Sequence, residues 1–404
     1  MNVRSLCLSV ALLSCTSAAT IIACASDETP SGPLPEPDAS TVPAPADAGV
    51  DADVDAEVDA SEPARPCTDD VLCPFGPFES STEGGPVPAR TRINAIRARG
   101  PSDVWVVGVS GAVAHYDGTS WKRSETGSRE AMRAVWLREN DEVAIASLTS
   151  MYRHNFDAAD AGVDAGPPSA DGWTAVGKPL GASTSAAAIV NSAWTTPGAE
   201  WVWITSIDAY SERTRKGIWR LHVVPATNQL DVRNPLPTGT CGTLECNQMT
   251  SVHGFSPDDL WVVGYGGEIL HVTEAQSTAP KFQRFDSQTW AELDAVWAAS
   301  ETEAWAVGGH GVVRHYTGHP YAWDVVTDVP ATETLRAVWG SSPSDVWAVG
   351  DAATVLHYDG TSWSRVEIAG IGNGRPDLLT VWSPAPGRVW IGGEGVFLSL
   401  GGMP

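Results

Sequence analysis

Short apolar stretches alternate with clusters of turn-forming residues along most of this chain, and the alternation repeats. The clearest copy runs from Leu335 to Val366, where an apolar segment ends at the turn sequence GSSPSD and an uninterrupted apolar run follows. Such a run is typical of a strand that is covered on both faces. The pattern predicts four short strands in each copy, here at Leu335–Trp339, Val346–Gly350, Thr354–Tyr358 and Trp363–Ile368.

Tryptophan marks the period of this repeat. Trp261, Trp305, Trp347 and Trp390 follow one another at intervals of 44, 42 and 43 residues. No stretch has a sustained helical period, so the fold is predicted to be all-β. Four-stranded units at this period are typical of β-propellers. Seven copies predict a seven-bladed β-propeller with four-stranded blades, the copies starting near Ile93, Met132, Ala186, Met249, Leu293, Leu335 and Leu378.

The last copy is incomplete. Leu378–Leu400 has room for only three strands, and an unpaired outer edge would invite aggregation. The segment Phe75–Thr82 precedes the first copy, so we expect it to supply the fourth strand and to close the ring. The propeller domain would then comprise residues 75–404. The alternative is a three-stranded last blade with a loose N-terminal segment.

The repeat SPSDVWAVG…VLHYDGTSW resembles the tryptophan-rich propeller repeats of many bacterial exported lipoproteins. These repeats are related to the BNR/Asp-box superfamily and to the photosystem II assembly-factor propellers. The resemblance covers roughly Ile93 to Gly402, and Asp117–Trp121 and Asp359–Trp363 look like shortened Asp-boxes. Asp-boxes are structural turns, so the resemblance implies the fold and leaves the activity open.

Residues 1–23 have the features of a secretory signal peptide: Arg4, a short apolar core and a small residue before Cys24. The core is too short and too polar to span a bilayer. Its end, Ile21–Cys24, resembles a lipobox, in which the cysteine is acylated. Leu12–Cys15 is a second fit, and a plain signal peptide with an incidental cysteine is the alternative.

We favour lipid attachment at Cys24, because a charged sequence follows it at once. Ala25 is not the aspartate that marks inner-membrane retention in enteric bacteria. The resemblance therefore implies an exported protein that is lipid-anchored in the cell envelope, at the outer membrane.

Residues 24–74 are predicted to form a disordered tether. Asp27–Glu62 is rich in Pro, Ala and Asp, and it carries eleven acidic and no basic residues. Such a segment cannot bury enough apolar surface to fold. Its run Asp51–Asp59 lacks the glycine and the terminal glutamate of an EF-hand, so a solvated spacer is favoured over a weak divalent-ion site. Asp157–Gly172 has the same composition and is predicted to be a surface loop.

The formal net charge of −24 argues against some partners. Nucleic-acid recognition requires a basic face, and so does binding to anionic lipid. We therefore expect no nucleic acid, and membrane contact only through the lipid anchor. Four cysteines lie outside the signal peptide and Cys24. In an exported chain they suggest two local disulfides, with zinc as the less common alternative, and they are Cys67, Cys73, Cys241 and Cys246.

Most histidines and tryptophans recur in register. His115, His271, His315 and His357 occupy one repeat position, which favours a structural role, since an active site needs one special constellation. His310 and His319 fall outside the register and are candidates for a partner surface. The repeating tryptophans are expected to pack between blades, with sugar stacking as the alternative.

Two function classes remain open. The first is a non-catalytic binding or scaffold propeller, without cofactor or metal, whose partner is a protein or glycan of the cell envelope. The second, by resemblance, is a sialidase-like hydrolase, which needs three clustered arginines, a Tyr–Glu pair and an acidic Asp. Arg97, Arg133 and Arg336 adjoin first strands and can converge on the channel, but nothing else in the sequence completes the set. Arg213, Arg215 and Lys216 are further candidates for a partner surface.

Overall fold

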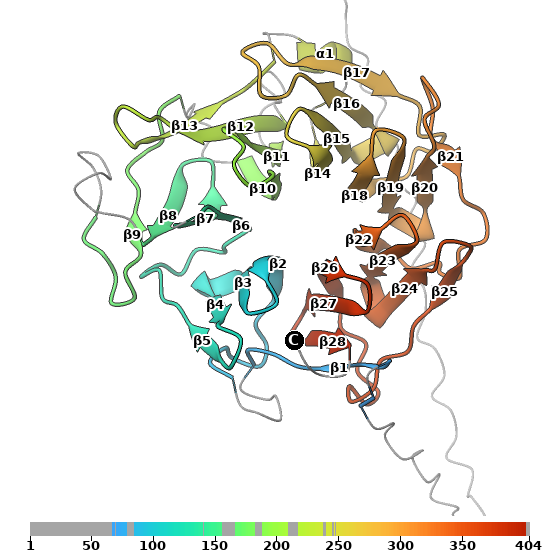
Figure 1. Cartoon of the computed structure of the whole chain (residues 1–404), viewed down its shortest axis with the longest axis horizontal. Helices are drawn as coiled ribbons and strands as arrows, with labels where there is room; N and C mark the ends of the chain where they lie inside the picture. Colours follow the sequence, from blue (N-terminus) through green and yellow to red (C-terminus); the bar gives the residue numbers. More distant parts are fainter. Residues whose placement is uncertain are drawn as a thin grey trace, which may run out of the picture. The chain divides into compact units, whose positions relative to one another are not determined.

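The computed structural model describes residues 67–68, 70–78, 85–139, 141–155, 166–181, 188–208, 217–236, 240–244, 246 and 248–400. The described residues form seven four-stranded antiparallel sheets that are arranged radially about one axis (Figure 1). The seven-bladed β-propeller predicted from the repeat is therefore confirmed. The first strand of each of the seven blades lies nearest the axis, and strand order in each of the first six sheets follows the chain.

The first three blades include the two most irregular copies of the repeat, which form blades 2 and 3. Blade 1 consists of β2 (Ile93–Gly100), β3 (Asp103–Gly108), β4 (Val113–Tyr116) and β5 (Trp121–Arg123). Blade 2 consists of β6 (Ala134–Leu137), β7 (Glu142–Ser147), β8 (Ser150–His154) and β9 (Thr174–Ala175). Blade 3 consists of β10 (Ala188–Trp194), β11 (Val202–Asp208), β12 (Ile218–Val223) and β13 (Leu230–Arg233).

The remaining blades are more regular. Blade 4 consists of β14 (Met249–Ser256), β15 (Asp259–Gly264), β16 (Ile269–Thr273) and β17 (Lys281–Phe285). Blade 5 consists of β18 (Leu293–Ser300), β19 (Glu303–Gly308), β20 (Val313–Tyr316) and β21 (Asp324–Val325). Blade 6 consists of β22 (Leu335–Ser342), β23 (Asp345–Gly350), β24 (Thr354–Tyr358) and β25 (Trp363–Arg365). Blade 7 consists of β26 (Leu378–Ala385), β27 (Arg388–Gly393), β28 (Phe397–Leu400) and β1 (Leu72–Pro74).

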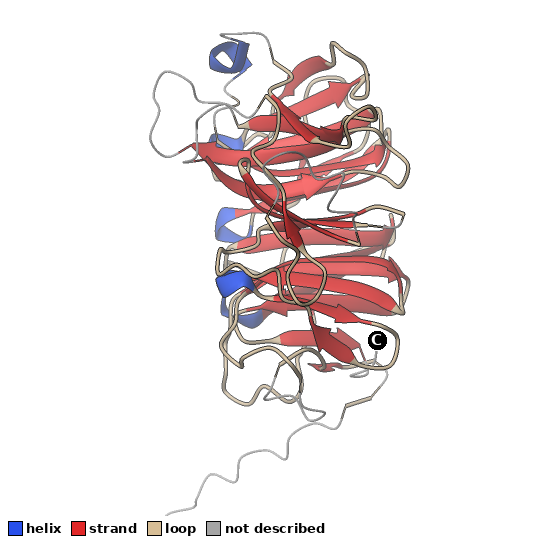
Figure 2. Cartoon of the chain, turned by 90° about the vertical axis from the view of Figure 1, so that its left-hand side faces the viewer, coloured by secondary structure: helices blue, strands red, loops and turns tan. Residues whose placement is uncertain are grey.

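Helical segments are short and lie on one side of the molecule (Figure 2). Within the described residues, four 3-10 turns join second to third strands, and one α-helical turn, α1 (Thr240–Leu244), follows blade 3. We call the side that carries these 3-10 turns the helical face; the turns are η1 (Val109–Gly111), η3 (Tyr265–Gly267), η4 (Gly309–Gly311) and η5 (Asp351–Ala353). The first strands begin at this face, because Asp351 N–H donates to the carbonyl oxygen of Thr334 at 2.9 Å.

An N-terminal strand does complete the last blade, but not the one predicted. β1 pairs with β28 in the register Leu72↔Leu400 to Pro74↔Leu398, so the predicted strand Phe75–Thr82 and the domain start at Phe75 are placed too late. The physical reason is local. Gly76 and Pro77 end the pairing, and Pro77 has no N–H to donate. Residues 79–82 of the predicted strand lie outside the described residues.

The segment after β1 links the last blade to the first. Phe75 packs edge-on against Tyr116 of blade 1, with ring centroids 5.8 Å apart. Phe78 is buried in the same cluster, which also contains Trp390 of blade 7. Because β1 itself also contacts blade 6, where the Ala369 N–H after β25 donates to the Leu72 carbonyl oxygen at 2.8 Å, one short N-terminal segment holds three neighbouring blades together.

The cores lie mainly between blades. Trp261 of blade 4 has 0% of its surface exposed, and its ring centroid lies 4.6 Å from that of Tyr316 and 4.9 Å from that of Trp323, both in blade 5. Trp305 meets Trp363 of blade 6 in the same way. Interblade packing of these repeating tryptophans agrees with the sequence-based expectation, and it leaves their faces unavailable for sugar stacking.

Candidate functional site

Six of the seven first strands contain a β-bulge near their start. In blade 5 the pairing with the second strand shifts between Leu293 and Ala295, which leaves Asp294 as the extra residue. A bulge of this kind redirects one side chain and is frequent next to functional sites. The extra residues are of five types, since blades 1 and 3 both have asparagine, and they are Asn94, Asn191, Thr250, Asp294, Arg336 and Leu379.

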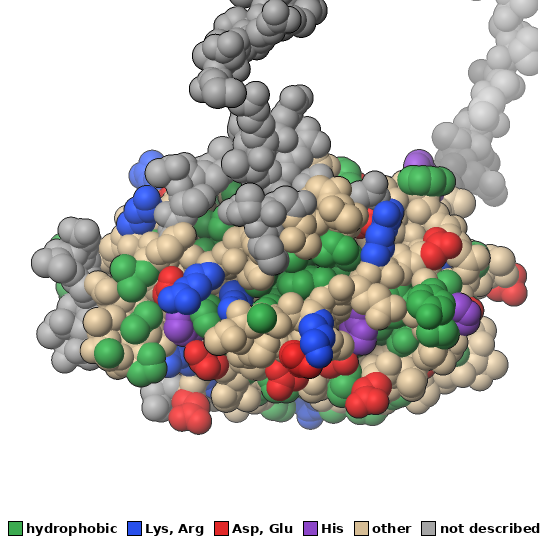
Figure 3. Space-filling view, turned by 90° about the horizontal axis from the view of Figure 1, so that it is seen from above, with side chains coloured by type: hydrophobic (Ala, Val, Ile, Leu, Met, Phe, Trp, Pro, Cys, Tyr) green, Lys and Arg blue, Asp and Glu red, His purple; other side chains and the backbone are tan. Residues whose placement is uncertain are grey.

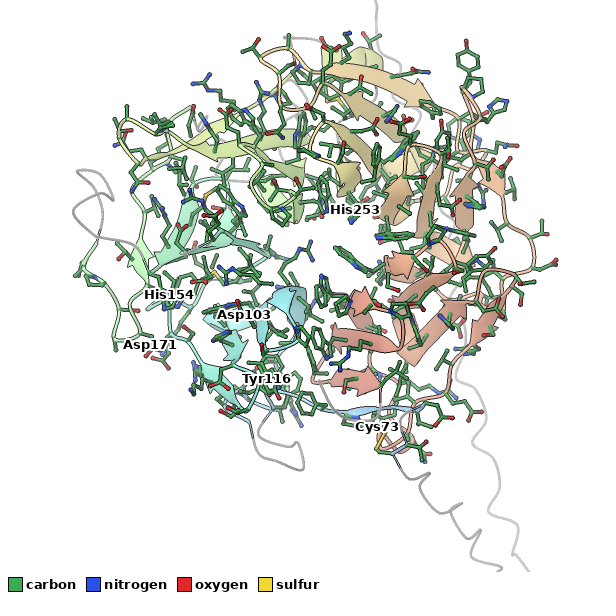
Figure 4. All side chains as sticks on the ribbon, in the orientation of Figure 1. Cys73, Asp103, Tyr116, His154, Asp171 and His253 are labelled. Carbon is green, nitrogen blue, oxygen red and sulfur yellow. A yellow bond between two sulfur atoms is a disulfide. The ribbon has the colours of Figure 1, made fainter. Side chains whose placement is uncertain are left out.

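All six bulge residues line one central cavity of about 110 Å³. Arg133 of blade 2 lines it as well, so every blade contributes a side chain. Three positions further along the strands, Arg97, His253 and Trp339 also border the cavity. The Arg97 guanidinium lies 5.5 Å from the Trp339 ring centroid, and His253 meets the same ring edge-on at 4.8 Å. These three side chains, from blades 1, 6 and 4, therefore meet one another inside the ring, where Figure 4 labels His253.

Two arginines in the cavity have no carboxylate partner among the described residues. The Arg97 Nη atoms donate to the carbonyl oxygens of Ile96 at 2.8 Å and Ala193 at 3.0 Å, and burial lowers the pKa of Arg97 to about 10. Burial and the neighbouring Arg92 lower the pKa of Arg133. No hydrogen bond of its guanidinium to another described residue is formed. Buried charge without a counter-ion is costly, so an anion that entered the cavity would be stabilised.

His253 is uncharged, but its ring N–H group is a further positively polarised group in the cavity. Burial, together with the nearby Arg97, lowers its pKa to about 3. Its Nδ1 accepts a hydrogen bond from the Ala298 N–H at 3.1 Å. The proton of the neutral ring is therefore on Nε2, which forms no hydrogen bond within the described part of the chain.

Acidic side chains gather on the other side of the cavity, at blades 5 and 6. Arg336 Nε and Nη2 bind the two carboxylate oxygens of Asp351 at 2.8 and 2.9 Å, and its Nη1 donates to Asp294 at 3.2 Å. The second oxygen of Asp294 is buried without a partner among the described residues. Burial, and next the charge of Glu292, raise the pKa of Asp294 to about 7. Tyr265 hydrogen-bonds to Glu292, whose pKa is raised by burial.

The structure brings together all three arginines that the sequence offered for the channel. Arg97, Arg133 and Arg336 line the same cavity, and Tyr265–Glu292 is a Tyr–Glu pair next to Arg336 that sequence reasoning missed. The three arginines are not equivalent. Arg336 is held by two carboxylates, while the Nη atoms of Arg97 are used by backbone carbonyls.

The other candidates lie elsewhere. Cys24, Arg213, Arg215 and Lys216 fall outside the described residues. His310 is the central residue of η4, with a positive φ of 58°. His319 accepts hydrogen bonds at Nδ1 from the backbone N–H groups of Tyr321 and Ala322, which is a turn-forming arrangement. The cysteines form the local pairs that the sequence favoured, Cys67–Cys73 and Cys241–Cys246.

The recurring histidines belong to a repeated packing cluster. In blade 6, Asp345 accepts hydrogen bonds from Trp347 Nε1 at 3.0 Å and His357 Nε2 at 2.7 Å, while the two rings stack. Blades 1 and 5 repeat this arrangement around Asp103 and Glu303. The expected structural role fits this geometry, although the bonds form within a blade rather than across blades.

Among the described residues, no helix is long and apolar enough to cross a membrane. In the same part of the chain, no group of three or more His, Cys, Asp or Glu side chains is placed to hold a metal ion. On the outer side of the propeller that Figure 3 shows, basic and acidic side chains are interspersed, so no patch of one charge gathers there. The uncompensated charges described above belong to the central cavity and its edge.

No protein-family model matches the sequence, and no curated protein sequence does. Solved propeller structures do resemble the fold. YCF48 from Cyanidioschyzon merolae has a TM-score of 0.57 at 13% identity, covering 78% of this chain and 96% of its own. A structure of YCF48 bound to D1 peptide has a TM-score of 0.56 at 13% identity, with 83% and 98% covered.

A third structure is the extracellular domain of the putative hybrid two-component system BT3049 from B. thetaiotaomicron. It has a TM-score of 0.55 at 9% identity, with 82% of this chain and 42% of that chain covered. At these identities the likeness shows the propeller fold. The likeness to YCF48 therefore supports the propeller part of the sequence resemblance only, and none of these structures bears on its lipoprotein or Asp-box part.

Proposed function

We propose that this chain is a non-catalytic binding protein whose propeller takes up an acidic group of an extended partner segment in the central cavity. The observation that carries the proposal is the pair Arg97 and Arg133, which line the cavity without carboxylate partners among the described residues. A peptide carboxylate would supply the missing counter-charge through charge-assisted hydrogen bonds.

Two further observations support a binding role. The repeated polar residues are used in packing clusters, while the bulged positions carry five different residue types in six blades. In addition, a propeller of similar fold, YCF48, has been solved with a bound peptide. Capture of chain termini and extended segments by backbone and side-chain donors is a common mode of peptide recognition.

The experiment compares binding of a random octapeptide library with free C-termini and of the same library amidated. We expect wild type to retain the free-acid library better, and Arg133→Gln to lose that preference because the cavity loses its unpaired cation. Arg388→Gln is the matched control, since Arg388 is exposed at the start of β27. Absence of any peptide retention by wild type would contradict the proposal.

We further propose that the protein is exported and anchored through acylated Cys24, with residues 24–66 as a tether. The support is the signal-like N-terminus and the lipobox-like residues before Cys24. Mass spectrometry of the membrane fraction is expected to find a lipid-modified N-terminal Cys24. A Cys24→Ser variant that still sediments with membranes after a salt wash would refute this anchor.

A second candidate function is a sialidase-like hydrolase, and one observation favours it. The cavity contains three arginines and Asp294, whose pKa of about 7 suits a general acid, and the Tyr265–Glu292 pair lies near Arg336. Against it, Arg336 is already neutralised by Asp351 and Asp294. Turnover of a sialoside by purified protein, abolished in Glu292→Gln, would establish this function and overturn the non-catalytic one.

A further inference from the structure

Trp290 is a tryptophan that does not pack in the core of the propeller. It lies in the connection between β17 and β18, and 88% of its surface is exposed. In each of three connections, a carbonyl oxygen packs on the last glycine of a 3-10 turn, and the residue that follows this carbonyl differs. It is Trp290 before blade 5, Arg129 before blade 2 and Thr332 before blade 6. A tryptophan exposed to this extent contributes almost no packing energy, so its apolar ring is available to a partner.

Trp290 is two residues before Glu292 in the connection between β17 and β18. Its connection touches η3, because any side chain at Gly267 would collide with the Thr289 carbonyl. Tyr265, the first residue of η3, is 41% exposed and hydrogen-bonds to Glu292. We call the group formed by Tyr265, Trp290, Glu292 and the cavity-lining Asp294 the acidic rim.

The acidic rim has an excess of negative charge. Glu292, Asp294 and Asp351 face a single cation, Arg336, whose guanidinium is already bound by Asp351 and Asp294. One oxygen of Asp294 has no partner within the described residues. Each of these carboxylates would gain from a further cation, and an incoming anion would be repelled.

We propose that the acidic rim binds a lysine or arginine side chain of the segment that the central cavity takes up. The inference rests on the proposed function and adds the chemical class of a second contact. A cation is attracted to the faces of tryptophan and tyrosine, and its N–H groups can donate to Glu292 and Asp294. The unpaired arginines belong to blades 1 and 2, so a peptide that carries one basic side chain and one carboxylate fits both sides of the cavity.

The experiment uses a positional-scanning octapeptide library with free C-termini, bound to the full chain. Wild type is expected to enrich lysine or arginine about five- to tenfold at one position, as one exposed cation–π contact and ion pair provide. Trp290→Ala and Glu292→Gln are expected to abolish that enrichment while still binding the library. Two matched controls should keep it: Tyr321→Ala, an exposed aromatic residue, and Glu301→Gln, an exposed carboxylate on the β18–β19 turn.

The outcomes separate the two proposals. If the library binds with no basic preference, or if both rim variants keep the preference, the acidic rim is not a cation site and the inference fails alone. If wild type binds no peptide, the proposed function fails and the inference falls with it. Because Trp290 is so exposed, loss of the preference in Trp290→Ala at an unchanged melting temperature reports binding rather than folding.

Discussion

Asp345 and Asp294 have the same exposure and opposite environments. Both side chains are 11% exposed, and each lies in one of the first two strands of its blade. Burial alone would raise the pKa of Asp345, but hydrogen bonds from His357 and Ser341 lower it. Burial raises the pKa of Asp294 to about 7, because Arg336 offsets only part of the desolvation and Glu292 adds repulsion.

The difference follows the repeat. Asp345 has counterparts in blades 1 and 5 with the same two partners, whereas Asp294 occupies a bulge position whose residue type varies around the ring. The recurring cluster is satisfied within its own blade. Asp294 keeps one oxygen without a partner among the described residues, and it is to such incompletely balanced charges at the cavity that we assign binding.

The largest expected effect on the free energy of unfolding comes from replacing a tryptophan of the repeat, in comparison with the exposed Trp290. Trp261→Ala removes a ring that packs between blades 4 and 5, and it should lower the free energy of unfolding by about 3–5 kcal/mol. Trp290→Ala removes an exposed ring and should change it by less than about 0.5 kcal/mol. Urea denaturation followed by circular dichroism measures both, and equal losses would remove the distinction between recurring and variable residues.

The same Asp→Asn change should have opposite consequences at the two carboxylates. Asp345→Asn weakens charge-assisted bonds to His357 and Trp347 and should cost about 1–3 kcal/mol at pH 7. Asp294→Asn removes a charge that lacks full compensation, so stability should be unchanged or higher, with Arg336 still held by Asp351. Thermal melts of the two variants beside wild type check the sign; destabilisation by both would show that Asp294 is structural.

The pH dependence should differ in the same way. The lowered pKa of Asp345 gives stability that is present above its unfolded value of 3.8 and is lost as the solution becomes more acidic. The raised pKa of Asp294 gives stability that is present below 3.8 and is lost as pH rises towards 7. The advantage of Asp294→Asn over wild type should therefore grow between pH 4 and pH 8. An advantage that is constant over that range would mean that the pKa of Asp294 is not raised.

The smallest effect is expected at three basic residues of the sequence between β11 and β12, which lie outside the described residues. Charge reversal at Arg213, Arg215 and Lys216 should leave the free energy of unfolding within about 0.5 kcal/mol, as for most surface changes. It should weaken association with an acidic partner if these residues form a partner surface. Retention of the octapeptide library, unchanged by the reversal, would confine binding to the cavity.

The sequence predicts the repeated blades of the ring well, and it predicts the closing strand less well. Period, strand content and the turns at Asp117 and Asp359 are local properties of a repeated pattern, and Asp117 does accept the N–H groups of Thr119 and Ser120. The closing strand was misplaced because β1 pairs over only three residues, too few for any alternation to show.

Part of the cavity could also be predicted. Arg97, Arg133 and Arg336 stand at first-strand positions, so their approach follows from the repeat. The Tyr265–Glu292 contact joins two connections whose side-chain directions depend on turn geometry and a bulge, and no spacing rule gives these. Trp290 carried a usable signal, because it is a tryptophan outside the repeat register, but its exposure depends on what the neighbouring connection leaves uncovered.

The disulfide Cys67–Cys73 determines how the ring is mechanically loaded. Any pull on the chain before Cys67 passes through this bond to Cys73, which is the middle residue of β1 and is paired with Ser399 of β28. The residues between the two cysteines would carry none of the tension. Force therefore enters within the closing strand, between two fully buried residues, Leu72 and Cys73, rather than at its frayed end. Blade 7, which closes the ring, is thus also the blade that receives any pulling force applied to the chain before Cys67.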